Sequence, residues 1–271
     1  MAEVVIDKSF LDGVATARIQ QLCASHACFF TETLFYEAMT STAESRLRCF
    51  SKLPDKTNPV FLLPRSGNLM AFEFQNQLAC GSLTDHRVRH SFVFNAGLRT
   101  GTYVAPPEVE QTLANWRAEV DADTQSFLDR CQSVHEFFPE LIGIEFRDFA
   151  AAVANARARV AVDVDLVRRI YGSFIGQGAP ANAPAPSAIG PEWFLFRWLQ
   201  SQLLAALRLF LRYQCRIPNP PSPTVLLKAE HSMHDADYVA LGAHAGAIAT
   251  LDREVAEDFK LLRPSKVVFS R

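Results

Sequence analysis

Short apolar runs, each leading into an acidic or hydroxyl residue, mark the first part of the chain. Val4–Ile6 ends at Asp7, and Ala27–Phe30 ends at Thr31. Runs of this length, rich in β-branched and aromatic residues, predict strands that are buried on both faces, as in a parallel sheet. Between them, the apolar residues from Phe10 to Ala24 recur at helical spacing, which predicts a helix that packs on the sheet.

The last part of the chain repeats this order. Residues Asp235–Ala247 predict a helix with a small apolar face, and Gly246 suits its C-terminal stop. Ala247–Thr250 reads as a short strand, and Lys266–Phe269 reads as a final strand after a charged helical turn. Strands that alternate with helices in this way predict an α/β fold with a doubly wound parallel sheet.

The middle of the chain has a different character. A near-helical step over Val109–Val134 predicts a long amphipathic helix, and Phe146–Ile170 predicts another. Gly176–Pro191 is a linker rich in Pro, Ala and Gly, and Ile217–Pro223 blocks helix formation.

We therefore expect residues 1–80 and 224–271 to form a discontinuous α/β core, and residues 81–223 to form a mainly helical insertion or cap. Phenylalanines on both sides of the boundary at residue 80 alternate with polar residues, which predicts strands that contribute to a core. These phenylalanines are Phe72, Phe74, Phe92 and Phe94.

One apolar segment, Trp193–Leu211, is long enough to raise the question of a membrane span. Arg197, Gln200, Gln202 and Arg208 interrupt it, and no uninterrupted stretch approaches the roughly 20 residues that a span needs. We expect a buried core helix rather than a membrane span, with an interfacial helix as the alternative.

Composition and charge narrow the class of protein. The net charge of -2 leaves no broad basic field of the kind that non-specific nucleic-acid binders carry, so nucleic acid would have to bind through a local patch or bound metal. The six cysteines form no CxxC pair and have no nearby His at zinc-finger spacing, which favours reduced thiols. The N-terminus has no basic region ahead of an apolar run. These features together predict a cytoplasmic protein.

The residues with the most promising chemistry are acids near strand ends. Asp7 follows one strand and Asp252 another, while Asp235 and Asp237 open the predicted helix before that second strand. Glu37 lies in the helix after Ala27–Phe30. Ligands of an open parallel sheet bind at the carboxyl ends of its strands. Each acid alone is ordinarily a turn, cap or surface residue, but together they would repel one another unless a cation lies among them, and Mg²⁺ or Mn²⁺ suits such oxygen ligands.

The segment VVIDKSFL resembles the opening of PIN-like nuclease domains, in which a strand is followed by Asp and, two residues on, by a small polar residue. Asp7 and Ser9 stand at these positions. FFTETLFYEAM resembles the second element of that family, a strand that ends in Ser or Thr and leads to a helical Glu. Thr31 and Glu37 match it.

HDADYVALGAHAGAIATLD resembles the third element of the PIN-like family, which runs from an acid through a small-residue helix and a Gly to a strand and T-x-D. Asp235, Gly246, Thr250 and Asp252 match this pattern, and Asp237 is an additional acid. The resemblance covers about 45 residues at each end of the chain and says nothing of the segment between them.

The resemblance implies a three-layer α/β/α sandwich around a central parallel sheet, bound divalent metal, and ribonuclease activity of a toxin-like or RNA-processing kind. The implied catalytic residues are Asp7, Glu37, Asp235 and Asp252. They would hold one or two Mg²⁺ or Mn²⁺ ions, with Asp237 as a further candidate ligand. The candidates for contacts with the RNA substrate are Ser9, Thr31, Thr250, Lys8 and Arg253.

Two other functions remain open from the sequence. One is a catalytically silent PIN-like scaffold that binds protein or RNA partners, or a second copy of itself, through the helical insertion. The other is an unrelated α/β phosphohydrolase, although the chain lacks the second Asp, two residues after Asp7, that aspartyl-phosphate enzymes show.

Overall fold

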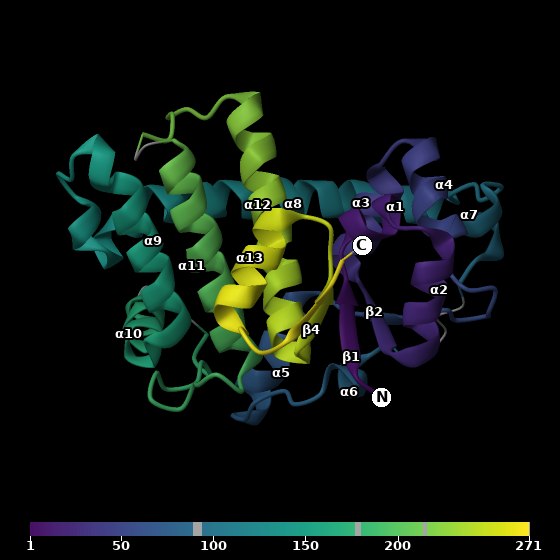
Figure 1. The fold of residues 1–271 in the computed structure, drawn as a ribbon, viewed down its shortest axis with the longest axis horizontal. Helices are drawn as coiled ribbons and strands as arrows, with labels where there is room; N and C mark the ends of the chain where they lie inside the picture. Colours follow the sequence, from purple (N-terminus) through teal and green to yellow (C-terminus); the bar gives the residue numbers. More distant parts are fainter. Residues whose placement is uncertain (89–93, 177–179, 214–215, 271) are drawn as a thin grey trace.

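A central sheet of five parallel strands organises the computed structural model, which describes residues 1–88, 94–176, 180–213 and 216–270 (Figure 1). The strands are β1 (Glu3–Ile6), β2 (Ala27–Thr31), β3 (Phe61–Leu63), β4 (Ala247–Ala249) and β5 (Val267–Phe269). Their order across the sheet is β3-β2-β1-β4-β5, and each neighbouring pair is parallel. The prediction of an α/β fold with a parallel sheet is confirmed.

The connections of the sheet run outward in both directions from β1. From β1 the chain adds β2 and β3 on one side, and its last part adds β4 and β5 on the other. Val5 pairs in register with Phe29 of β2 and with Ile248 of β4, so β1 is the central strand. The strand order reverses between β1 and β4, and such a switch point is where open α/β sheets bind ligands.

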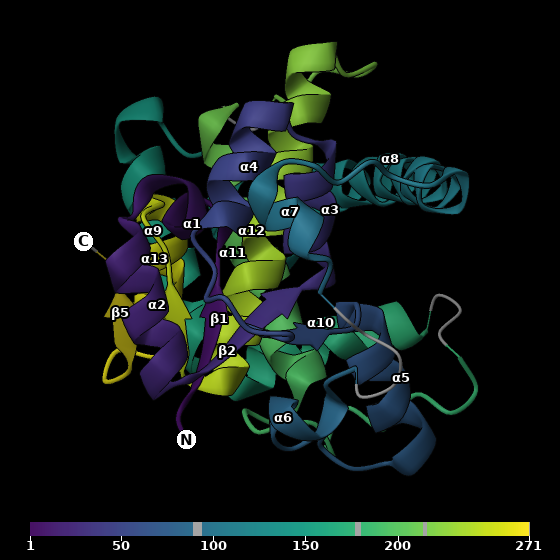
Figure 2. The same cartoon turned by 90° about the vertical axis from the view of Figure 1, so that its right-hand side faces the viewer.

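Helices cover both faces of the sheet. Figure 1 shows α2 (Thr16–Ser25) on one side of β1 and β2 and α12 (Pro223–Ala245) on the other, and Figure 2 shows α2 in front of the strands with α12 behind them. The other helices of the N-terminal part are α1 (Lys8–Gly13), α3 (Glu32–Thr40), α4 (Ala43–Ser51), α5 (Ser66–Asn76), α6 (Leu83–His86) and α7 (Ala96–Thr100).

The middle of the chain is helical, as predicted. It forms α8 (Pro107–Phe137), the 3₁₀ turn η1 (Pro139–Leu141), α9 (Phe146–Val162), α10 (Val164–Ile175) and α11 (Phe194–Arg212), and α13 (Arg253–Leu262) follows β4. Helix α8 crosses the molecule behind α12 and reaches the region of α3 (Figure 1). One buried hydrophobic cluster contains Val5 of the sheet, Phe127 of α8 and Leu204 of α11. The helical segment and the sheet therefore share a core.

Helix α11 is buried inside the protein, as the interrupted apolar segment predicts. Two of its polar side chains pair with each other and with α9: Arg197 Nη1 donates to Gln200 Oε1 at 2.8 Å, and Gln200 Nε2 donates to the Val160 carbonyl oxygen at 2.8 Å. Among the described residues, no helix combines the length and the apolar character that crossing a bilayer requires.

The structure corrects three predictions of local structure. Helix α12 begins at Pro223, with the Ser222 hydroxyl as its cap, so Asp235 lies in the middle of the helix and is not an N-terminal cap. The predicted helix 146–170 is divided at Asp163, which accepts from the Leu166 N–H at 2.8 Å and starts α10.

The third correction concerns the alternating phenylalanines. Phe72 and Phe74 lie in α5 and Phe94 lies outside any strand, while Phe92 is outside the described residues. Apolar and polar residues can also alternate over a few positions of a helix, as they do in α5. The polar residue between two phenylalanines can then face a neighbouring helix instead of solvent.

A buried acid from α5 caps the start of α11. Glu73 is 0% exposed, and its carboxylate accepts from the N–H groups of Phe194 at 2.7 Å, Leu195 at 2.9 Å and Cys80 at 3.0 Å. Trp193, the N-cap residue of α11, supplies no side-chain cap. Glu73 thus satisfies helix N–H groups that would otherwise be buried without acceptors.

We predict that Glu73→Ala lowers the free energy of unfolding by about 2–3 kcal/mol, because buried N–H groups lose their acceptor. Glu73→Gln, which keeps one acceptor oxygen, should lose less. Urea denaturation measures both, with the exposed Gln75→Ala in the same helix as the control. A loss for Glu73→Ala no larger than that for Gln75→Ala would contradict the capping role.

Candidate acidic site at the switch point

Asp7 lies at the end of β1, and neighbouring hydroxyls hold its carboxylate in place. Its backbone N–H donates to the Ala249 carbonyl oxygen at 3.0 Å, which extends the pairing of β1 with β4. Its carboxylate caps α1 through the Ser9 N–H at 3.1 Å, and accepts from the Ser9 hydroxyl at 2.6 Å and from the Thr250 hydroxyl. Burial raises the pKa of Asp7 although these donors oppose the shift.

The Ser9 hydroxyl joins the ends of β1 and β4. It accepts from the N–H groups of Leu251 at 2.9 Å and Asp252 at 3.1 Å, and lies 3.2 Å from the Thr250 hydroxyl. Asp252 in turn caps α13, because its Oδ1 accepts from the Glu254 N–H at 2.7 Å. Ser9 and Thr250 therefore position Asp7 and the segment that carries Asp252 relative to each other.

Asp235, from the middle of α12, faces this edge of the sheet. Burial raises the pKa of its carboxyl to about 8, and neighbouring negative charges add to the shift: Asp252, Asp7, Glu37 and Glu254. In the part of the chain that the structure describes, its carboxylate has no hydrogen bond and no ion pair. The four acids predicted from the sequence, Asp7, Glu37, Asp235 and Asp252, thus lie close enough to interact electrostatically.

Glu37 differs from the other three acids because a histidine side chain lies against its carboxylate. The Tyr238 hydroxyl donates to Glu37 Oε2 at 2.5 Å, and His234 Nδ1 lies 3.5 Å from Glu37 Oε1. Burial alone would raise the pKa of Glu37, but the bond to His234 and its charge lower it. The same pairing raises the pKa of His234 against the effect of its burial.

The sequence did not point to His234 and Tyr238 as partners of Glu37. Both side chains are buried. Their spacing of four residues puts them on one face of α12, and this spacing is the signal that would have found the pair once the helix was known to begin at Pro223.

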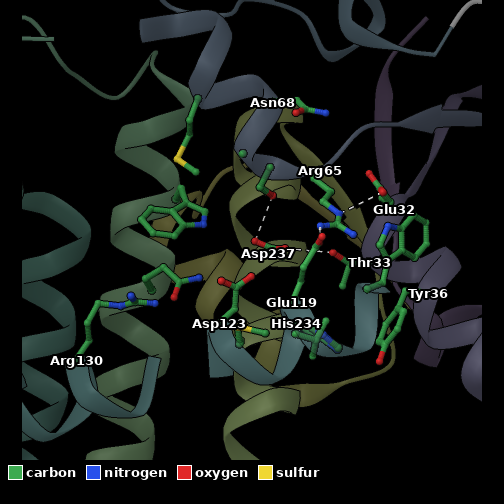
Figure 3. Close-up of a pocket in the computed structure, with 18 residues that line it drawn as sticks. Glu32, Thr33, Tyr36, Arg65, Asn68, Glu119, Asp123, Arg130, His234 and Asp237 are labelled. Atoms are coloured by element: carbon green, nitrogen blue, oxygen red, sulfur yellow. Dashed lines mark hydrogen bonds and ion pairs between the residues drawn. The ribbon is translucent and has the colours of Figure 1, made fainter. Parts of the chain in front are cut away.

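Asp237 lies apart from the other acids. Two residues along an α-helix correspond to a rotation of about 200°, so Asp237 and Asp235 face away from each other. Asp237 accepts from the Thr33 hydroxyl at 3.1 Å and from the Ser66 hydroxyl at 3.2 Å, and it lines a separate cavity (Figure 3).

The other residues predicted for substrate contacts have varied surroundings. Thr31 is buried and caps α3, because its hydroxyl accepts from the Leu34 N–H at 3.0 Å. Lys8 lies close enough to lower the pKa of Glu37. The Arg253 side chain is 87% exposed and pairs with Glu257 at 3.4 Å, so it does not occupy the acidic site.

The four acids are of the chemical type that binds divalent cations, but their present side-chain arrangement does not form a metal site. No three His, Cys, Asp or Glu side chains within the described ranges are arranged so that they could hold a metal ion. An unpartnered, largely buried Asp235 among other carboxylates is nevertheless the donor set that Mg²⁺ or Mn²⁺ prefers. Binding would require side-chain rotation, which Asp235 can make without breaking a hydrogen bond.

Together, these features define a doubly wound α/β protein with clustered carboxylates at its switch point. Comparison of the chain with models of known protein families, with curated proteins and with solved structures gave no match.

The raised pKa of Asp235 makes stability depend on pH. In the unfolded chain the Asp235 carboxyl has its usual pKa of 3.8, whereas in the folded protein it keeps its proton up to about pH 8. Between these two pH values the folded state therefore binds more protons than the unfolded state. Stability therefore falls as the pH rises from about 4 to 8 and the loss is complete above that range. We predict that Asp235→Asn raises the free energy of unfolding at pH 8 by about 2 kcal/mol or more in EDTA.

The control for this variant is Asp165→Asn, because the Asp165 side chain is 79% exposed. Thermal unfolding at pH 5 and pH 8 distinguishes the two. An equal response of both variants to pH would contradict the buried, repelled state of Asp235.

Proposed function

We propose that this protein is a divalent-cation-dependent ribonuclease in which Asp7, Glu37, Asp235 and Asp252 bind Mg²⁺ or Mn²⁺. The observation that carries the proposal is the unpartnered Asp235 carboxylate, which is buried beside the other acids at the switch point of the sheet. A cation removes the repulsion that the grouped carboxylates otherwise impose.

The surrounding residues suit an organised site. Ser9 and Thr250 orient Asp7, and the backbone of α13 orients Asp252. Glu37 would join the cation by exchanging His234 for it, since an ion pair at 3.5 Å is the looser of its two contacts. RNA is the proposed substrate because the acids stand at the positions of the PIN-like motifs.

In the proposed reaction, a water molecule loses a proton and its oxygen forms a bond to phosphorus as the bond to the leaving sugar oxygen breaks. The leaving oxygen takes up a proton, so the number of protons is unchanged. The bound cation would supply a lowered water pKa and stabilise the negative charge on the phosphate. Lys8, at the start of α1, and the exposed Arg253 are the proposed contacts for the neighbouring phosphates.

A scaffold without turnover is the second candidate function. The pairing of Glu37 with Tyr238 and His234 favours it, because one of the four acids already has partners without a cation. Such a protein would bind its partner through helices α8–α11.

Incubation of a mixed-sequence labelled RNA with the pure protein tests the proposal, with Mn²⁺, Mg²⁺ or EDTA in parallel. The ribonuclease requires cleavage with either cation and none in EDTA. No cleavage with either cation would favour the scaffold, and cleavage that persists in EDTA would contradict the cation dependence.

A further inference from the structure

A cavity of about 470 Å³ with both polar and apolar walls lies beside the acidic site, between α3, α5, α8, α11 and α12 (Figure 3). This volume is within the range of cavities that bind small organic ligands. The side chains of His234 and Glu37 separate the cavity from the acidic edge of the sheet: His234 lines the cavity and lies 3.5 Å from Glu37. A ligand in the cavity would therefore be close to the proposed site of phosphodiester hydrolysis.

The two arginines of the cavity have different roles. Arg65 pairs with Glu32 at 3.2 Å and with Glu119, and its guanidinium covers the Trp116 ring at 5.0 Å. The Arg130 guanidinium has no hydrogen bond and no ion pair to any residue that the structure describes. Its guanidinium carries five N–H donors, so Arg130 retains donors for a ligand, whereas Arg65 is committed to the protein.

The cavity also retains hydrogen-bond acceptors. The buried Gln202 Oε1 has no donor within the described structure. Asp237 accepts two hydroxyls, one at each oxygen, and a carboxylate has about four acceptor positions in all. A ligand that satisfies this cavity must bring donors toward Asp237 and Gln202 and acceptors toward Arg130.

A planar ligand suits the remaining wall. Arg65 covers Trp116, whereas no ring or cation stacks on Trp198 in the described parts of the chain, and indole faces stack nucleobases. Asp123 and Asp237 both line the cavity, and burial raises the pKa of Asp123 although Arg130 opposes the shift. A ring that carries no negative charge suits these two carboxyl groups.

We propose that this cavity is a guanine-binding subsite for the RNA substrate, an inference that rests on the proposed ribonuclease function. Guanine carries adjacent N–H donors on its Watson–Crick edge, which face Asp237, and the O6 and N7 acceptors on the neighbouring edge, which face Arg130. Its ring stacks on Trp198. The sugar and phosphate then extend past His234 toward the acidic edge.

Calorimetric titration of the protein with GMP, AMP, CMP and UMP in EDTA tests this subsite without requiring a cation or cleavage. GMP should bind about tenfold more tightly than each of the others, as expected for one bidentate pair. Asp237→Asn and Arg130→Gln should each remove this preference, while Arg18→Gln, at an exposed position of α2 outside the cavity, should keep it.

Equal binding of the four nucleotides, absence of GMP binding at millimolar concentration, or an unchanged preference in both cavity variants would overturn the subsite. Two variants at different ends of the cavity protect the test against misfolding of one of them, and thermal unfolding confirms that each is folded. Cation-dependent cleavage by a protein without GMP preference would overturn the subsite alone. GMP preference without any cleavage would uphold the subsite and overturn the ribonuclease function.

Discussion

Asp252→Asn should lower the rate of cation-dependent RNA cleavage by about 100-fold or more, because loss of a proposed ligand exceeds the 10- to 100-fold effect typical of groups that only orient ligands. The same variant should unfold at nearly the parent temperature. Asn is as good an N-cap as Asp, so the contacts to the Glu254 and Val255 N–H groups at the start of α13 remain.

This pairing of a large catalytic loss with little change in stability separates catalysis from folding. Asp252→Ala is the companion variant, because it removes the cap as well and should lose about 1 kcal/mol of stability in addition. Asp129→Asn on the exposed part of α8 is the matched control for charge. A cleavage rate for Asp252→Asn within threefold of the control would contradict the assignment of Asp252.

Asp258→Ala should lower the free energy of unfolding by about 3–5 kcal/mol. Asp258 of α13 pairs with Arg208 of α11 at 2.8 Å and with Arg157 of α9, and all three side chains are largely buried. Removal of the carboxylate leaves two arginines facing each other without their shared partner. The loss should exceed that of an ordinary surface ion pair several-fold.

Urea denaturation of Asp258→Ala and of Glu257→Ala, its exposed neighbour in α13, measures this effect. Arg157→Met in combination with Asp258→Ala should recover part of the loss, because it removes the charge that Asp258→Ala leaves unpaired, whereas Arg208 keeps its ion pair with Glu254. A loss for Asp258→Ala below about 1 kcal/mol, or no recovery in the double variant, would contradict the proposed role of the cluster.

The strands were predictable because a parallel sheet buries both faces of its central strands. Val4–Ile6 and Ala27–Phe30 read as continuous apolar runs, and both lie in strands of the structure. The Gly246 stop was predictable for another physical reason, since its backbone has the left-handed conformation, with φ of 88°, that favours glycine. These are local properties, and local sequence carries them.

The start of α12 was not predictable in the same way. The prolines before it are typical of a helix block, yet Pro223 occupies the first turn of the helix, where no N–H partner is needed. The first turns of α12 bury Val225 and Ala229 but leave Leu227 exposed, so their apolar residues mark the inward face only weakly. This error placed Asp235 and Asp237 at a helix start and hid the fact that they face different sites.

The candidate site was predictable in part. The rule that ligands bind at the carboxyl ends of parallel strands brought Asp7 and Asp252 together, and the structure places them at neighbouring strands. The partners of Glu37 and the cavity around Asp237 depend on packing between helices far apart in the sequence. The same is true of the Glu73 cap, whose acceptor and donors are separated by more than 100 residues in two of its three bonds.

Titration of the protein with Mn²⁺ at pH 7, by calorimetry in two buffers of different ionisation enthalpy, tests the central claim most directly. Asp235 has a pKa of about 8 and holds its proton at this pH, so binding should release a proton and the measured heat should differ between the buffers. Asp235→Asn should bind Mn²⁺ more weakly and without this release. No binding heat and no rise in unfolding temperature at millimolar Mn²⁺ would contradict the cation site and the ribonuclease function with it.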